Sequence, residues 1–219
     1  MRKIQLAPGE HYHVCNRGVN KGIIFHDNGD YNRFLFLILY FQSPINFPQV
    51  GRSVDEFVKH SVLDNAGEII EKRTVELVAF CIMPNHFHLI IKSLDDESIS
   101  AYMHRVLNAY AKYYNTKYKK SGHVFQGPYR AVHIIDDRQL LHTSAYVHRN
   151  PREISRWFKN EDKYQWSSYQ DFIGENRFDS LLMPDIVVGQ FRNKAEYYEF
   201  VKTSPAKLIE GELDYLINM

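Results

Sequence analysis

The chain contains little cysteine and no hydrophobic run long enough to cross a membrane. Only 2 of its 219 residues are cysteines, Cys15 and Cys81, and both lie in apolar, strand-like segments. A disulfide framework is therefore excluded as the basis of the fold, and we expect reduced thiols that pack inside a cytoplasmic protein. The opening residues, MRKIQLAPGE, lack the apolar stretch of a signal peptide, and no later segment approaches a membrane span. We expect no membrane partner.

The chain also lacks an excess of charge of either sign. Lys and Arg together number 27 and Asp and Glu number 26, so the net charge alone does not indicate a nucleic-acid partner. Internal repeats and low-complexity segments are absent as well. A length of 219 residues is enough for one large domain, or for one domain with an appendage. Any electrostatic attraction to nucleic acid must therefore be local.

The most informative segment is residues 77–92, LVAFCIMPNHFHLIIK. It predicts two apolar strands joined by a turn at 83–86, because proline and asparagine favour successive positions of a tight turn. Since side chains alternate along a strand, His86 and His88 lie on one face and the apolar residues between and after them on the other. Two neighbouring imidazoles suit a metal ion. Two half-buried histidines with ordinary neighbours are the simpler alternative, so the metal interpretation needs a third ligand.

The remaining apolar patterns predict helices and strands in alternation. We expect a strand at 11–17, a helix at 30–42 capped by Asp30, a long connection at 43–73, the strand pair at 77–92, a helix at 99–119, a strand within 124–134, and a helix at 137–150. This order indicates an α+β fold, a ferredoxin-like split βαβ antiparallel sheet with helices on one face. Residues 1–152 would form this domain, and residues 153–219 a helical C-terminal appendage packed on it.

One side chain of the helix at 137–150 does not follow the apolar pattern. At about 100° per residue, Tyr146 falls away from the apolar side of the helix, together with His142 and Asn150. Asn150 follows Tyr146 by one helical turn, so both can reach the same point in space. A surface tyrosine, or one that packs against the sheet because the helix is tilted, is an equally simple explanation.

Four short motifs stand in order along the chain. They are Y-H-V-x-N-R-G at 12–18, M-P-N followed by His-hydrophobic-His at 83–88, Y-V-x-x-N-P at 146–151 and Y-x-W-S-S-Y at 164–169. This combination, over about residues 11–175, resembles the REP-associated branch of the single-tyrosine HUH transposases, within the IS200-like transposase superfamily. The resemblance implies that Tyr146 is the nucleophile, that His86 and His88 are metal ligands, and that Asn150 occupies the place of a third ligand.

The resemblance also implies a reaction and a substrate. Asparagine is a weak ligand, so water and the substrate phosphate would complete the coordination shell, and His142 is an alternative third ligand. Nitrogen and oxygen donors with an open position suit Mg²⁺ or Mn²⁺, although two imidazoles are unusual for Mg²⁺ and Zn²⁺ could also bind. The ion would stabilise charge on the phosphate that Tyr146 attacks. The implied enzyme is a single-stranded DNA endonuclease and strand transferase that acts on hairpin-forming repeat DNA through a 5′-phosphotyrosine.

A locally basic stretch fits such a substrate. Residues 98–152 carry nine Lys and Arg against two Asp, interleaved with aromatic side chains that can stack on unpaired bases. A solvated helix face with core aromatics is the alternative interpretation. We expect DNA contacts from Asn16, Arg17, Arg105, Lys112, Lys117, Lys119, Lys120, Arg130 and Arg149.

Other functions stay open at the level of the sequence. One is a domesticated, non-catalytic binder of structured single-stranded nucleic acid. Another is a phosphodiesterase that activates water and does not use Tyr146 as the nucleophile. The resemblance leaves monomer and homodimer both open, because such transposases include both.

Overall fold

The computed structural model describes residues 6–45, 50–60, 63, 65–96 and 98–204. Its centre is an antiparallel sheet of four strands in the order β2-β3-β1-β4. The strands are β1 (His11–Arg17), β2 (Val75–Met83), β3 (His86–Ser93) and β4 (Arg130–Ile134). β1 pairs with both β3 and β4, so the first strand joins the two halves of the sheet.

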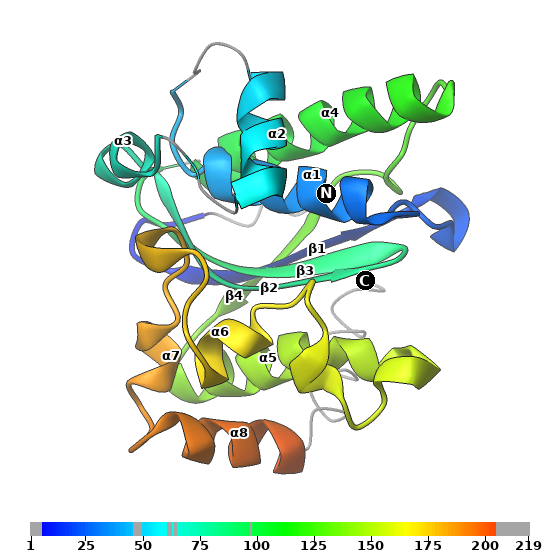
Figure 1. Cartoon of the computed structure of the whole chain (residues 1–219). Helices are drawn as coiled ribbons and strands as arrows, with labels where there is room; N and C mark the ends of the chain where they lie inside the picture. Colours follow the sequence, from blue (N-terminus) through cyan, green and yellow to red (C-terminus); the bar gives the residue numbers. More distant parts are fainter. Residues whose placement is uncertain (1–5, 46–49, 61–62, 64, 97, 205–219) are drawn as a thin grey trace.

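Two crossover helices connect these strands on one face of the sheet (Figure 1). α1 (Asn28–Tyr40) leads from β1 to β2, and α4 (Ser98–Tyr118) leads from β3 to β4. Strand order and connections are those of the ferredoxin-like split βαβ arrangement, so the predicted α+β fold class is confirmed. The connection at 43–73, predicted without regular structure apart from a weak helical pattern, contains the helices α2 (Val50–His60) and α3 (Ala66–Glu71).

The first core lies between the sheet and the crossover helices. Val14 and Phe87 point from the strands into this layer, where the ring of Phe34 on α1 lies 4.8 Å from that of Phe87 and 5.2 Å from that of Tyr110 on α4. α1 is buried on nearly every side, as its continuous apolar run predicts.

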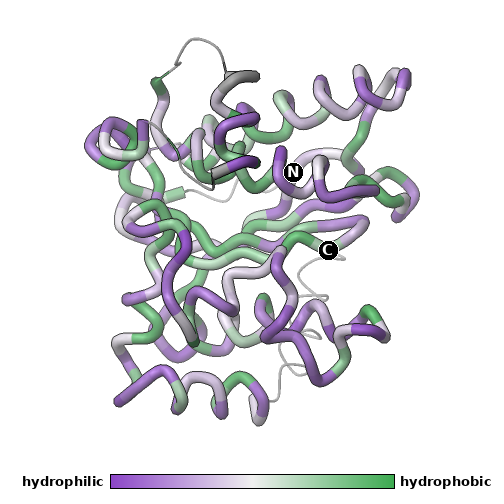
Figure 2. The backbone as a smooth tube through the Cα atoms, viewed as in Figure 1, coloured by the Kyte–Doolittle hydropathy of each residue, from purple (hydrophilic) through white to green (hydrophobic). Residues whose placement is uncertain are grey.

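The opposite face of the sheet is also covered, by α5 (Asp137–Arg149) and the helices that follow it in the chain (Figure 1). Ala79 and Ile90 of the sheet form a second core with Val147 of α5 and Tyr197 of the C-terminal region. The prediction of helices on one face therefore holds for the crossover helices and not for α5. The reason is that the sheet is apolar on both faces, so both need a cover. Figure 2 shows hydrophobic residues concentrated along the strands, between the two helical layers.

The chain after α5 consists of short helices. They are α6 (Tyr169–Ile173), α7 (Asp185–Val188) and α8 (Lys194–Thr203), with the single-turn 3₁₀ helices η2 (Asn150–Glu153), η3 (Ser155–Trp157), η4 (Glu161–Lys163) and η5 (Asp179–Leu181). Another 3₁₀ turn, η1 (Val19–Lys21), follows β1. Several of these elements pack with α5 in the second core. The division of the chain at residue 152 stays a prediction.

One helix start differs from the sequence-based expectation. α1 begins earlier, because Asp27 and not Asp30 caps it: the Asp27 carboxylate accepts a hydrogen bond from the Asp30 backbone N–H at 3.1 Å. β4 lies within the predicted range 124–134. No helix in the described part of the chain combines the length and the apolar character that a membrane crossing requires.

Candidate active site

The turn between β2 and β3 is held against the loop that follows β1. The Gly18 backbone N–H donates to the Asn85 carbonyl at 2.8 Å, and the Asn85 side-chain amide donates to the Lys21 carbonyl at 3.0 Å. Gly18 has no room for a side chain, because a Cβ atom there would lie 2.2 Å from the carbonyl oxygen of Gly22. The glycine that ends the motif at 12–18 thus allows this loop to close on the turn.

His86 is the first residue of β3 and is fixed by two asparagines. Its Nδ1 lies 2.7 Å from Asn85 Oδ1, and its Nε2 lies 3.4 Å from Asn150 Oδ1. Because an amide oxygen only accepts, the shorter contact places the ring hydrogen on Nδ1 and leaves a lone pair on Nε2. Burial lowers the pKa of His86, and the nearby charge of Arg17 lowers it further, against an opposing effect of Asn150.

His88 lies buried two residues further along β3. Its Nδ1 is 2.9 Å from Nε2 of His13, and the two rings stack with centroids 5.1 Å apart and an interplanar angle of 7°. Burial lowers the pKa of His88 well below its usual value and that of His13 to about 4. Both rings are therefore neutral at pH 7, as a metal ligand requires.

Tyr146 reaches this strand from the C-terminal half of α5, and Asn150 from the residue that follows the helix. The Tyr146 ring stands edge to face against His88 at a centroid distance of 5.3 Å and against His13 at 5.8 Å. The Asn150 amide donates to the Tyr146 carbonyl at 2.9 Å, so its oxygen faces His86. The side chains of His86, His88, Tyr146 and Asn150 thus converge.

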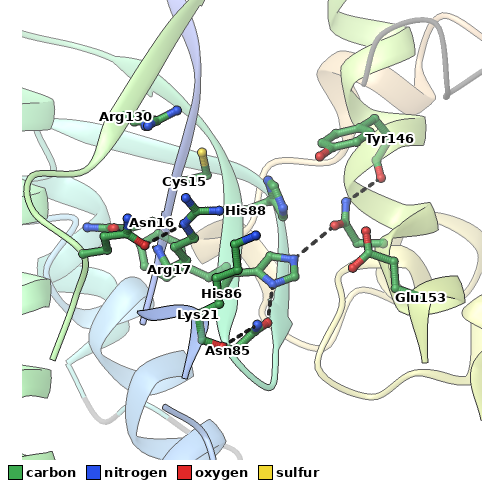
Figure 3. Close-up of a pocket in the computed structure, with 13 residues that line it drawn as sticks. Cys15, Asn16, Arg17, Lys21, Asn85, His86, His88, Arg130, Tyr146 and Glu153 are labelled. Atoms are coloured by element: carbon green, nitrogen blue, oxygen red, sulfur yellow. Dashed lines mark hydrogen bonds between the residues drawn. The ribbon is translucent and has the colours of Figure 1, made fainter. Parts of the chain in front are cut away.

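The converging side chains line one cavity of about 290 Å³ (Figure 3). Among its charged residues are Arg17, Lys21 and Arg130, against Glu153. The full lining consists of Cys15, Asn16, Arg17, Lys21, Asn85, His86, Phe87, His88, Gln126, Arg130, Tyr146, Asn150 and Glu153. Three cations against one carboxylate make this cavity suitable for an anion such as a phosphodiester. His142, the alternative third ligand, lies apart from this lining, against the ring of Phe200 on α8.

Three of the residues expected to contact DNA lie at this cavity. They are Asn16, Arg17 and Arg130. Arg17 Nε donates to Gln126 Oε1 at 2.9 Å, and the Asn16 amide donates to the Gly127 carbonyl at 3.2 Å. These bonds hold the end of β1 to the loop before β4, so both segments present their basic side chains to the same opening.

The expected residues of α4 lie outside the cavity lining. Arg105 lies over the ring of Phe41, 4.3 Å from its centroid, and Lys117 pairs with Asp27 at 2.8 Å and with the buried Asp30 at 2.7 Å. Arg105 and Lys117 therefore have structural contacts within the fold.

The other basic candidates are at the surface or near α8. Lys112 and Lys119 are exposed, and Lys120 donates to the Tyr114 hydroxyl at 3.1 Å. Arg149 donates to the carbonyl of Ser204. Contacts of any of these residues with DNA stay predictions.

Two residues beside the site were not among the sequence candidates. His13 bonds to His88, and Cys15 is paired with His88 across the β1–β3 ladder. Alternation along β1 places both on the same sheet face as His88, which a sequence can indicate only when the pairing of β1 with β3 is known. No pattern in the sequence indicated that Glu153, which follows α5, lies at the site.

The donor atoms offer two places for a cation, one between His86 and Asn150 and one beside His88. In the first, His86 Nε2 and Asn150 Oδ1 lie 3.4 Å apart, and each atom has a lone pair. Asn85 accepts the ring hydrogen of His86 at Nδ1, and the Tyr146 carbonyl accepts from the NH₂ end of the Asn150 amide. Ligands with bonds of about 2.1 Å to one ion lie about 3 to 3.4 Å apart, so this pair suits an ion between its atoms.

In the second, the donor atoms of His13, Cys15 and His88 all lie within 4.8 Å of one another. A thiol with two imidazoles suits Zn²⁺, whereas the set that contains an amide oxygen suits Mg²⁺ or Mn²⁺. The set His86, His88 and Asn150 and the metal that it would hold stay predictions.

The comparisons with known proteins agree with the motifs. Residues 51–150 match the family model described as Transposase IS200 like. A solved structure of a REP-associated tyrosine transposase bound to a REP hairpin has a similar fold, with a TM-score of 0.53 and 14% identity, over 79% of this chain and 84% of that chain. No curated protein matches. The match covers slightly less than half of the chain, and together with the similar fold it agrees with the family that the motifs predicted, the IS200-like transposases.

Proposed function

We propose that the protein is a metal-dependent single-stranded DNA endonuclease and strand transferase, with Tyr146 as its nucleophile. The convergence of Tyr146 from α5 with His86 and His88 from β3 on one cationic cavity carries this proposal. The structural relative is described as bound to a REP hairpin, which supports hairpin-forming single-stranded DNA as the substrate. The cytoplasmic location and the oligomeric state stay predictions.

His86, His88 and Asn150 would hold a divalent cation, Mg²⁺ or Mn²⁺. When bound, the cation would supply positive charge at the scissile phosphate and at the leaving 3′ oxygen. The residues themselves present lone pairs: His86 through Nε2 and Asn150 through Oδ1, which lie 3.4 Å apart. Arg17 and Arg130 at the cavity rim would bind the phosphates on either side.

Tyr146 would perform the covalent step. Its phenol oxygen attacks phosphorus, the phenol proton leaves to water, the bond to the 3′ oxygen breaks, and that oxygen departs and becomes a 3′-hydroxyl. The product is a 5′-phosphotyrosine. Because the new bond conserves the energy of the phosphodiester, the 3′-hydroxyl of another strand can attack it and rejoin DNA without a nucleotide cofactor.

A covalent adduct tests the proposal. The protein is incubated with Mn²⁺ and single-stranded hairpin oligonucleotides from the repeats that flank its gene, and the mixture is separated on a denaturing gel. We expect a protein–DNA adduct that disappears in Tyr146→Phe and persists in Tyr198→Phe, a matched change on α8. Cleavage without an adduct would favour the water-activating phosphodiesterase. Binding without cleavage in Mn²⁺, Mg²⁺ and Zn²⁺ would favour the non-catalytic binder.

A further inference from the structure

His13 is a buried histidine that contacts both the proposed ligand and the proposed nucleophile. It is 1% exposed, its Nε2 lies 2.9 Å from His88 Nδ1, and its ring meets the ring of Tyr146 edge to face at 5.8 Å. Its side chain is not part of the cavity lining. Its position therefore suits action through His88 and not on the substrate.

We propose that His13 is a positioning residue that sets which nitrogen of His88 is available to a cation. It does so by accepting, at its own Nε2, the hydrogen on His88 Nδ1. The inference rests on the proposed function, because it takes His88 as a metal ligand.

The argument follows from the number of hydrogens on a neutral imidazole. Such a ring carries one N–H and one lone pair, and only the lone pair can bind a cation. When His88 donates from Nδ1 to His13, its Nε2 keeps the lone pair. When His13 donates instead, the hydrogen of His88 lies on Nε2 and blocks it. The direction of this one hydrogen bond thus decides whether His88 can act as a ligand through Nε2.

The neighbouring ligand has the same arrangement. His86 Nδ1 lies 2.7 Å from Asn85 Oδ1, which can only accept, and its Nε2 faces Asn150. Each of the two proposed ligands therefore has a partner at Nδ1 and would use Nε2 for the cation. Partners of this kind fix the tautomer and the ring orientation of metal-binding histidines.

His13 differs from Asn85 in that it can bond in either direction. When it accepts at Nε2, its hydrogen lies on Nδ1, which has no hydrogen-bond partner among the described residues. A buried N–H without a partner is unfavourable, so the opposite direction competes in the metal-free protein. Binding of a cation at His88 would then select the direction in which His13 accepts.

Two substitutions separate this role from simple space filling. His13→Gln retains an oxygen that can accept from His88 Nδ1, whereas His13→Phe keeps a ring of similar size without an acceptor. We expect His13→Phe to weaken Mn²⁺ binding, measured by calorimetry, by about 10- to 100-fold, and His13→Gln to stay within about threefold of the wild type. His148→Phe is the control, because His148 is equally buried but bonds to Tyr197 and Ser168 and not to His88.

Nitrogen-15 NMR of the full-length protein supplies a readout independent of affinity and activity. Addition of Mg²⁺ should increase the fraction of His88 that carries its hydrogen on Nδ1 in the wild type and in His13→Gln, and much less in His13→Phe. Equal Mn²⁺ affinity and equal tautomer fractions in the wild type and His13→Phe would overturn the inference, as would equal losses in the Gln and Phe variants. A wild-type protein that binds neither Mn²⁺ nor Mg²⁺ would instead overturn the proposed metal site itself, and with it this inference.

Discussion

The ring of Tyr146 stands at 86° to the ring of His88, with centroids 5.3 Å apart, although the first lies on a helix and the second on a strand. The candidate site is therefore an interface between the sheet and the second helical layer. Its geometry depends on how α5 docks on the sheet, and on the hydrogen bonds that fix the side chains on either side.

Asn150 offers a test of the proposed ligand set. Its oxygen faces His86 Nε2, and its amide holds the Tyr146 carbonyl. We expect Asn150→Asp to bind Mn²⁺ at least as tightly as the wild type, because a carboxylate is a stronger ligand for hard cations. Asn150→Leu should weaken binding by about tenfold or more. Calorimetry with Mn²⁺ measures both, and equal affinities in the two variants would remove Asn150 from the ligand set.

Cys15 distinguishes the two donor sets. Its sulfur belongs to the cluster with His13 and His88, and has no part in the set made by His86, His88 and Asn150. We expect Cys15→Ser to leave Mn²⁺ affinity within about twofold of the wild type and to lower Zn²⁺ affinity about tenfold or more, because a hydroxyl is a poor ligand for Zn²⁺. Parallel titrations with the two metals measure this. A large loss of Mn²⁺ affinity would assign the metal to the cluster that contains the thiol.

The positive charge at the cavity predicts a salt dependence of DNA binding. Arg130 is exposed at the start of β4 and lines the cavity, whereas Lys112 is exposed on α4 outside it. We expect Arg130→Gln to weaken hairpin binding and to reduce the slope of log K against log[salt] by about 1. Lys112→Gln removes the same charge and serves as the matched comparison. Fluorescence anisotropy at several salt concentrations measures the DNA affinity of both variants.

The Lys112 result also tests the sequence-based expectation for α4. A slope reduced equally in Arg130→Gln and Lys112→Gln would extend the DNA interface along that helix. An unchanged slope in Arg130→Gln would remove the cavity rim from the interface.

His148 predicts how stability changes with pH. Burial lowers the pKa of this side chain from 6.5 to about 3. Between these values the unfolded chain binds a proton that the folded chain does not, so the free energy of unfolding falls as the pH is lowered from 6.5 toward 3. This one ring contributes a slope of about 1.4 kcal/mol per pH unit within that window.

Urea denaturation at pH 7 and at pH 5 measures the change. The variant His148→Gln should lose part of the pH dependence, although it is less stable at pH 7 because the bonds to Tyr197 and Ser168 are altered. A variant with the same pH dependence as the wild type would show that this ring is not the cause.

Much of the fold could be predicted from the sequence, because hydrophobic periodicity and turn-forming residues determine local structure. The strand pair at 77–92 was marked by its apolar alternation and by the proline and asparagine between the strands, and the structure has β2 and β3 there. The face of the sheet that α5 covers could not be predicted from the sequence, because it depends on which face the crossover helices leave exposed.

The site shows the same limit. Helical spacing brings Tyr146 and Asn150 together, and strand alternation does the same for His86 and His88. Their proposed roles come from the resemblance to the transposases and not from the spacing. His13 was not found, since its relation to His88 depends on the register between β1 and β3, which sets residues 75 positions apart in hydrogen-bond contact.

The sheet separates two cores that, among the described residues, share no fully buried side chain, although the half-buried Trp166 packs against both. Each helical layer can therefore loosen while the other keeps its own apolar contacts, as happens in sub-global unfolding. Detachment of α5 alone would carry Tyr146 away from His88 and leave the crossover helices packed on their face. Heating would then inactivate such a protein before it melts, with amide hydrogens of α5 exchanging sooner than those of α1.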